Sequence, residues 1–110
     1  MMEQGKKHLS DILQSIELIE QFTVTSSNFD EFSKDLKTQS AVELQLWIIG
    51  EAVNKYNKLL SEGLLEHSGK IVEFRNRLIH AYDAVDSSIV WAIIKNHLHP
   101  LNDEVINKLK

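Results

Sequence analysis

Hydrophobic residues recur every three or four positions along most of the chain, which is the period of an α-helix with one buried face. The clearest case covers about residues 5 to 24, where the apolar positions share one face: Leu9, Ile12, Leu13, Ile16, Ile19 and Phe22. The next residues, Thr23 to Ser27, are rich in hydroxyls and β-branched side chains and interrupt the period. The pattern therefore predicts a first amphipathic helix that ends near residue 24.

Two helix-capping signatures divide the region that follows. Asn28, with Glu31 three residues later, predicts the start of a short helix, and Ser40 with Glu43 predicts the start of a long helix over about residues 40 to 61. The apolar positions of the long helix cover more than one face, so we expect it to have two neighbours, one of which could be another subunit. The short helix would carry three apolar residues, Phe29, Phe32 and Leu36.

The second half of the chain contains most of the turn signals. Residues 61 to 69 resemble a loop with two glycines, and residues 70 to about 82 regain the helical period. Residues 83 to 86 then form a predicted turn, with Asp86 as the N-cap of a last helical region that Pro100 kinks or restarts. The apolar face of that region comprises Ile89, Val90, Ile93, Ile94, Leu98, Leu101, Val105 and Leu109.

Composition narrows the class of protein. With 110 residues, 43% hydrophobic and 25% charged, the chain fits one compact helical domain over residues 1–110. The absence of cysteine excludes disulfides and thiolate zinc sites, so we expect a cytoplasmic protein, and no apolar run is long enough to predict a membrane span. The net charge of −4 gives no general attraction for nucleic acid. Any RNA must therefore meet a local basic patch, for which Lys70, Arg75 and Arg77 are the candidates.

Arg75 is the main departure from the hydrophobic pattern. On a helical wheel it falls near the middle of the apolar stripe formed by Ile71, Val72, Phe74, Leu78 and Ile79. Because arginine keeps its charge, it needs a carboxylate, a phosphate or a solvent-lined cleft among such neighbours. Tyr82 lies two turns further on the same side, and Asn76 and His80 lie one turn apart on the adjacent face.

These residue types suit phosphoryl transfer. Arginine can hold a phosphate through two parallel hydrogen bonds, histidine can carry a proton near neutral pH, and the asparagine amide can orient a hydroxyl. RNA supplies its own nucleophile, the 2′-hydroxyl, so the chemistry needs neither a metal nor another cofactor. An ordinary structural alternative stays open, in which Arg75 pairs with Glu51 or Glu73 and His80 is a helix C-terminal cation.

Glu51 is the preferred partner of Arg75, and a catalytic carboxylate is a second possibility for it. Gly50 beside it predicts the close approach of another backbone, since glycine is unfavourable inside a helix.

The other histidines give no site, because His97 and His99 diverge by about 200° on a helix and so favour no shared metal. All four of these histidines are expected at the surface: His8, His67, His97 and His99. Trp47 and Trp91 are expected in the core or in a dimer interface, and Lys108 in a solvated tail.

The string Arg75-Asn76-Arg77-Leu78-Ile79-His80-Ala81-Tyr82 resembles the Arg, four residues, His, any residue, Tyr motif of HEPN-domain toxins of the HepT type. Three other segments are similar to recurrent parts of the same family and extend the resemblance over essentially the whole chain: Leu9 to Leu13, Ile48 to Ala52 and Val85 to Trp91. The resemblance implies an all-α antiparallel bundle of four to five helices that forms a homodimer, in which two copies of the motif face each other.

The resemblance also implies a function. Such a protein would cleave RNA, rather than DNA, without a metal, with Arg75 holding the phosphate, His80 transferring a proton and Asn76 supporting both. Its implied partner is a minimal nucleotidyltransferase antitoxin that transfers AMP to Tyr82. The adenylate would place negative charge beside Arg75 and compete with the substrate phosphate.

Two other functions remain open from the sequence. One is a non-catalytic HEPN partner that binds nucleotide or presents substrate to a nucleotidyltransferase, and the other is a structural helical dimer. The pairing of Arg75 with His80 favours the ribonuclease, because an adaptor does not need a histidine for proton transfer.

Overall fold

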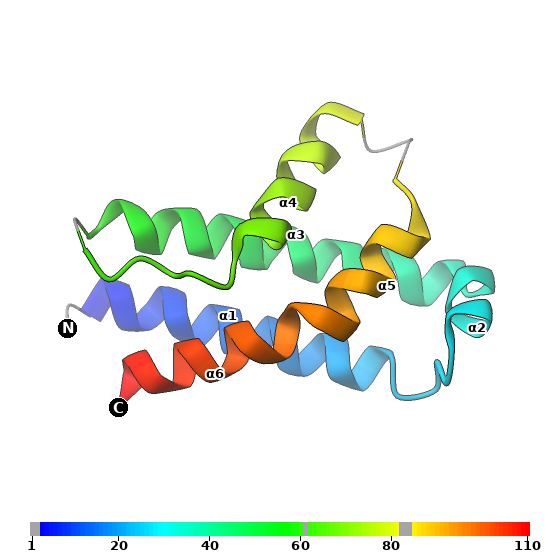
Figure 1. The fold of residues 1–110 in the computed structure, drawn as a ribbon, viewed down its shortest axis with the longest axis horizontal. Helices are drawn as coiled ribbons and strands as arrows, with labels where there is room; N and C mark the ends of the chain where they lie inside the picture. The colour runs from blue at the N-terminus through cyan, green and yellow to red at the C-terminus, as the bar shows by residue number, and fades with distance from the viewer. Residues whose placement is uncertain (1–2, 61, 82–84) are drawn as a thin grey trace.

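The computed structural model describes residues 3–60, 62–81 and 85–110, and these form six helices (Figure 1). In chain order they are α1 (Glu3–Phe22), α2 (Phe29–Lys34), α3 (Leu36–Lys58), α4 (Gly69–Ala81), α5 (Ser87–Asn96) and α6 (Leu98–Leu109). The prediction of an all-α antiparallel bundle is confirmed. The expected count of four to five helices is too low, since α2 is short and the last helical region is divided in two.

The core lies between the two long helices. α1 and α3 run antiparallel along the long axis of the molecule, and α6 lies against α1 (Figure 1). The predicted apolar face of α1 is the buried one, with Leu9, Ile12 and Ile19 fully inaccessible to solvent. Removal of this apolar surface from water is the main stabilising contribution to such a bundle. The first helix thus follows its hydrophobic period closely.

Side-chain caps fix where several helices begin. The Asn28 side chain accepts a hydrogen bond from the Glu31 backbone N–H, and the Asp86 side chain accepts one from Ser88, as the sequence predicts for α2 and α5. The predicted start of α3 at Ser40 is wrong. Asp35 caps this helix by accepting from the backbone N–H of Thr38, so α3 begins at Leu36, which is 73% exposed and does not belong to α2.

The last helical region is interrupted at His97, which ends α5 and precedes α6. Pro100 lies in the first turn of α6, where a missing backbone N–H costs no helical hydrogen bond, so the predicted restart is confirmed. The expectation that Lys108 belongs to a solvated tail is wrong. Its ammonium group donates a 2.8 Å hydrogen bond to the carbonyl of Gly63 and ties α6 to the loop before α4.

α4 departs from the bundle direction. Its main partner is α3, and its C-terminal end points away from the other helices (Figure 1). Ile71 and Phe74 are buried, whereas Ile79 near the end of the helix is 44% exposed. The helix that carries the motif is thus anchored at its start and open to solvent at its end. Among the described helices, none is both long and apolar enough to cross a membrane.

Candidate active site

Arg75 is held by residues from both α3 and α4. Its Nη2 donates to the Glu51 carboxylate in an ion pair, and its Nη1 donates to Asn76 Oδ1 at 3.0 Å. The guanidinium also lies over the Trp47 ring, 5.3 Å from the ring centroid, a cation–π geometry. The Arg75 side chain is only 20% exposed and that of Glu51 31%. The predicted pairing of Arg75 with Glu51 is therefore confirmed, whereas Glu73 pairs with Lys70 at 3.7 Å.

Gly50 makes this arrangement possible. A Cβ atom built on Gly50 would lie 2.7 Å from Arg75 Cβ and 2.9 Å from Arg75 Cγ, closer than such atoms approach in proteins. The expected close neighbour of Gly50 was another backbone. The contacting atoms instead belong to the stem of Arg75, which crosses α3 through the space that the glycine leaves open.

The guanidinium retains hydrogen-bonding capacity in this setting. Arginine carries five N–H donors, of which one bonds to Glu51 and one to Asn76. Nε is buried and has no partner among the described residues. One N–H therefore remains on each terminal nitrogen, and two such donors can bind two oxygens of one phosphate. The Glu51 carboxylate and the Trp47 indole fix the plane of the guanidinium and leave these two N–H groups available for a ligand.

His80 lies in the last turn of α4 and is exposed. It lies five positions after Arg75, so the two side chains diverge by about 140° around the helix. No hydrogen bond or ion pair joins the side chain of His80 to another residue in the described part of the chain. The structure does not bring Arg75 and His80 into direct contact within one molecule.

Asn76 connects the two positions. It is bonded to Arg75 and lies one helical turn from His80, with its side chain exposed. Tyr82, the residue predicted to accept AMP, lies outside the described residues. The motif residues that are described thus begin at a fixed, partly buried arginine and continue onto an exposed face of α4.

The predicted basic cluster is divided between two faces of α4. Lys70 and Arg77 lie two turns apart on one face, which diverges from Arg75 by about 140° to 160°. They line a groove of about 280 Å³ between α4 and α5, together with Glu73 and His97. Arg77 forms no ion pair with any residue that the structure describes. The sequence did not indicate this groove because three of its eight lining residues come from α5 and a fourth, His97, follows that helix.

Of the remaining candidates, His8 lines a pocket of about 220 Å³ together with Trp47 and Glu51, the residues that hold Arg75. No hydrogen bond or ion pair joins the others to Arg75 among the described residues. His99 is exposed and faces Asp103 at 3.3 Å, and His67 is exposed. His8 is half-buried, and so is His97, which was expected to be exposed. Trp91 stacks obliquely on Phe32 with a centroid separation of 5.2 Å, at the margin of the core. Within residues 3–60, 62–81 and 85–110, no three ligand-type side chains are grouped closely enough to hold a metal ion. The role of Trp47 under the guanidinium was not apparent from the sequence.

Comparison with known proteins connects this arrangement to a family. The model of the HepT-like ribonuclease family matches residues 12–107, which contain α3, α4 and every described residue around Arg75. The chain is 38% identical to the "Probable ribonuclease HepT" of Thermococcus cleftensis over 92% of both chains. It is 38% identical to "Putative RNase MJ0127" of Methanocaldococcus jannaschii over 80% of this chain and 73% of the relative.

A third relative, "Putative RNase TTE0752" of Caldanaerobacter subterraneus, is 35% identical over 94% of this chain and 93% of its own length. No solved structure matches the chain significantly. The family match covers most of the chain, and two of these three relatives align over more than 90% of their own lengths. The chain therefore belongs to the HepT-like ribonuclease family.

Proposed function

We propose that this protein is an endoribonuclease that cleaves RNA by attack of a substrate 2′-hydroxyl on the adjacent phosphorus. The 2′-oxygen loses its proton as it bonds to phosphorus, and the 5′-oxygen of the next nucleotide leaves and takes up a proton. The products would be a 2′,3′-cyclic phosphate and a 5′-hydroxyl. Because the substrate provides the nucleophile, this reaction requires only a phosphate clamp and proton transfer, and we propose that it proceeds without a metal ion.

The observation that carries the proposal is the environment of Arg75. The guanidinium is fixed by Glu51, Asn76 and Trp47 and still has one N–H on each terminal nitrogen. Donors held in place before the reaction stabilise the charge that develops on the phosphate more effectively than mobile ones. Arg75 would thus bind the scissile phosphate, His80 would transfer a proton at the 2′- or 5′-oxygen, and Asn76 would support both residues.

We further propose that the site is completed by a second copy of the chain. Arg75 and His80 diverge by about 140° on one helix, so one phosphate is more readily reached by residues of two facing helices. Exposed apolar side chains flank Arg75 on both helices: Leu44 of α3 is 57% exposed and Ile79 of α4 is 44% exposed. A symmetric dimer would cover these residues and place two motifs across one cleft.

The resemblance of the motif to that of HEPN-domain toxins supports a regulatory proposal as well. The protein would act as a toxin that a minimal nucleotidyltransferase antitoxin neutralises by transferring AMP from ATP to the Tyr82 hydroxyl, with release of pyrophosphate. An adenylate there would add negative charge near a cationic site and hinder RNA binding. Co-expression should raise the intact mass by one or more AMP units. A mass that does not change, or an increase that persists in Tyr82→Phe, would contradict this proposal.

The central test is cleavage of RNA by purified protein in the presence of a chelator, comparing wild type with Arg75→Ala and His80→Ala. We expect wild type to cleave and both variants to lose at least about 100-fold in rate, as removal of a charge-stabilising or proton-transferring group does. Thermal unfolding of each variant would separate lost chemistry from lost folding. A wild type that binds RNA without cleaving it would instead indicate the non-catalytic function.

A further inference from the structure

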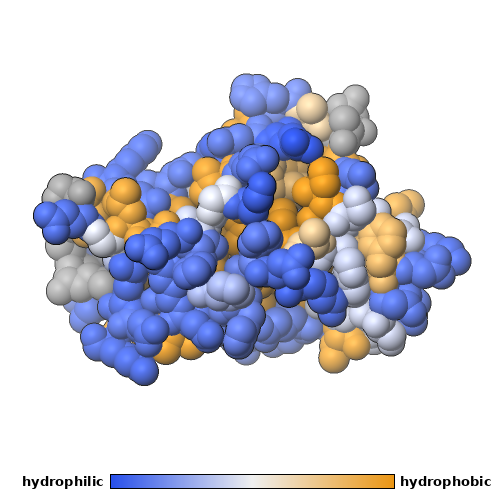
Figure 2. Space-filling view, in the orientation of Figure 1, coloured by the Kyte–Doolittle hydropathy of each residue, from blue (hydrophilic) through white to orange (hydrophobic). Residues whose placement is uncertain are grey.

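The groove between α4 and α5 combines an apolar floor with a charged rim. Its volume is about 280 Å³, and its floor is formed by Phe74 from α4 and by Ile89, Ala92 and Ile93 from α5. Figure 2 shows hydrophobic atoms exposed where α4 and α5 meet, surrounded by hydrophilic residues. Its volume lies near the lower end of the range found for small-molecule sites, which are concave and mostly apolar.

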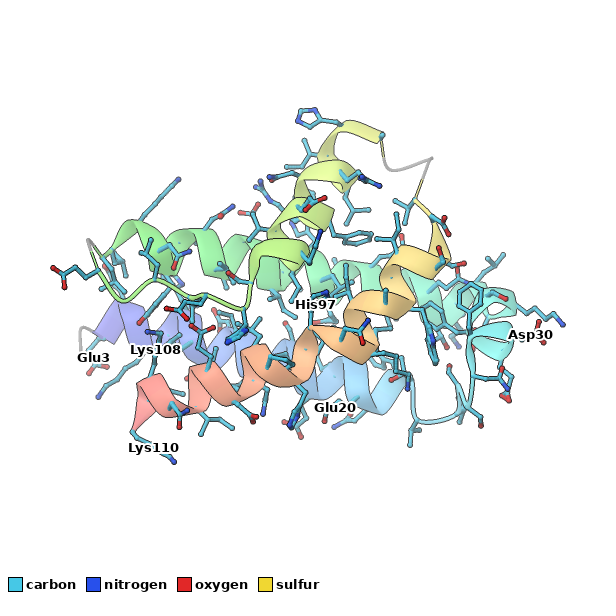
Figure 3. All side chains as sticks on the ribbon, viewed as in Figure 1. Glu3, Glu20, Asp30, His97, Lys108 and Lys110 are labelled. Atoms are coloured by element: carbon cyan, nitrogen blue, oxygen red, sulfur yellow. The ribbon has the colours of Figure 1, made fainter. Side chains whose placement is uncertain are left out.

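The charges at the rim favour an anionic ligand. Lys70, Arg77 and His97 line the groove, with Glu73 as the one carboxylate among its lining residues. Glu73 is engaged by Lys70 at 3.7 Å, whereas Arg77 has no carboxylate within ion-pair distance among the described residues. His97 lies where α5 passes into α6 (Figure 3). The local charge is thus positive in a chain whose net charge is −4.

The groove is connected to the Arg75 site through the exposed face of α4. His80 lies one turn from Arg77 and one turn from Asn76, and Asn76 is hydrogen-bonded to Arg75. Polar side chains therefore pass without interruption from the guanidinium around α4 to the groove. Arg77 diverges from Arg75 by about 160° around α4, so a strand that is held by Arg75 at one phosphate would have to pass around the helix to bring another phosphate to Arg77.

We propose that this groove is a binding subsite for a nucleotide that flanks the cleavage position, and that the substrate is single-stranded RNA at this point. A base would lie on the apolar floor, and Arg77 would bind the backbone phosphate beside it. Bases are available for such contacts only where they are unstacked, as in single strands and loops. The inference rests on the proposed ribonuclease function, which it extends by a substrate class and a subsite.

Binding of RNA to His80→Ala protein, in which cleavage is suppressed, tests the subsite directly. Affinity for a fluorescent single-stranded oligonucleotide would be measured over a range of salt concentrations. Adding Arg77→Ala should weaken binding about 10-fold and lower the slope of log Kd against log salt by about 0.7, the effect of one phosphate contact to a single strand. Lys58→Ala, which removes one positive charge at the exposed end of α3, is the matched control and should leave the slope unchanged.

A second variant tests the floor separately from the charge. Ala92 is exposed on α5, and glutamine is well tolerated in helices, so Ala92→Gln should fold normally while it narrows the groove. We expect about 10-fold weaker binding of the single strand with an unchanged salt slope. The same sequence as a duplex should be insensitive to Ala92→Gln.

Three outcomes would overturn the inference. Equal affinity and equal salt slope in Arg77→Ala would exclude the phosphate contact, and equal sensitivity of single strand and duplex would exclude the base contact. Sedimentation that shows a changed oligomeric state, with RNA affinity per subunit unchanged, would identify the groove as a protein interface. If wild type fails to cleave RNA while these variants still weaken binding as described, the ribonuclease proposal fails and the subsite stands.

Discussion

Replacing Gly50 by alanine introduces a methyl group into the contact between α3 and α4 that holds Arg75. The new Cβ would lie 2.7 Å from Arg75 Cβ, whereas ordinary contacts begin at 3.4 Å, a deficit of 0.7 Å. Arg75 Cβ is attached directly to the α4 backbone and cannot turn away as a flexible side-chain end could. The middle of α4, which carries Arg75, must therefore move away from α3 by most of this distance.

Two opposing effects determine the change in stability. Alanine is favoured over glycine inside a helix by about 1 kcal/mol, while forcing extra atoms into a packed contact costs about 1 to 3 kcal/mol. We expect Gly50→Ala to lose about 1 kcal/mol of unfolding free energy, which lowers the Tm by about 4 °C in a domain of this size. The effect on catalysis should be larger, because a displacement of about 1 Å at a catalytic group can cost about 100-fold.

The assay combines thermal unfolding with single-turnover cleavage of RNA. Gly69→Ala provides the matched control, because a Cβ at Gly69 would meet no atom within 4 Å. That control should keep the wild-type cleavage rate, whereas Gly50→Ala should cleave 10- to 100-fold more slowly with most of its stability intact. Gly50→Ala protein that is more stable than wild type and equally active would show that the close contact at Gly50 does not position Arg75.

Three further predictions concern charges on α3. Glu51→Ala should lower the free energy of unfolding in urea by about 1 to 2 kcal/mol and slow cleavage, because it leaves Arg75 partly buried without its carboxylate. Glu51→Gln should recover part of this stability. A wild-type cleavage rate in both variants would argue against a role of Glu51 in positioning Arg75. Hydrogen bonds from the Thr38 side chain and backbone lower the pKa of Asp35 below 3.8, so its stabilising effect is present above that pH and is lost as the pH falls through the lowered value. The free energy of unfolding in urea should therefore decrease less between pH 7 and pH 3 for Asp35→Asn than for wild type. Equal decreases would contradict a contribution of the ionised Asp35 cap to stability. Burial raises the pKa of Glu43 above 4.5, so its ionised form opposes folding as the pH rises through that range. In urea unfolding, Glu43→Gln should therefore be more stable than wild type at pH 7 but not below pH 4.

Periodic hydrophobic positions were sufficient to predict most of the helices, since α1, α4 and α5 each bury the face that their spacing indicates. The start of α3 was missed because two capping signatures compete. Asp35 forms the cap with Thr38, and Ser40 lies within the helix, a choice that local sequence alone does not determine. The capping residue therefore determines where α3 begins, which the hydrophobic period does not specify.

The site was predictable in part for a related reason. A charge in an apolar stripe demands a partner, so Arg75 and Glu51 could be paired from sequence. Trp47 under the guanidinium could not be inferred in the same way, because an aromatic residue on a helix fits core and surface roles equally well. The groove beside Arg77 arises from the packing of α5 near α4, which only the three-dimensional structure reveals.

Analysis of the RNA ends that the purified protein produces in the presence of a chelator tests most directly whether the substrate's 2′-hydroxyl is the nucleophile. Attack by the substrate's own 2′-hydroxyl, with Arg75 as the phosphate clamp, predicts a 2′,3′-cyclic phosphate on one fragment and a 5′-hydroxyl on the other. Fragments with a 5′-phosphate, or cleavage that stops when the metal is removed, would contradict it.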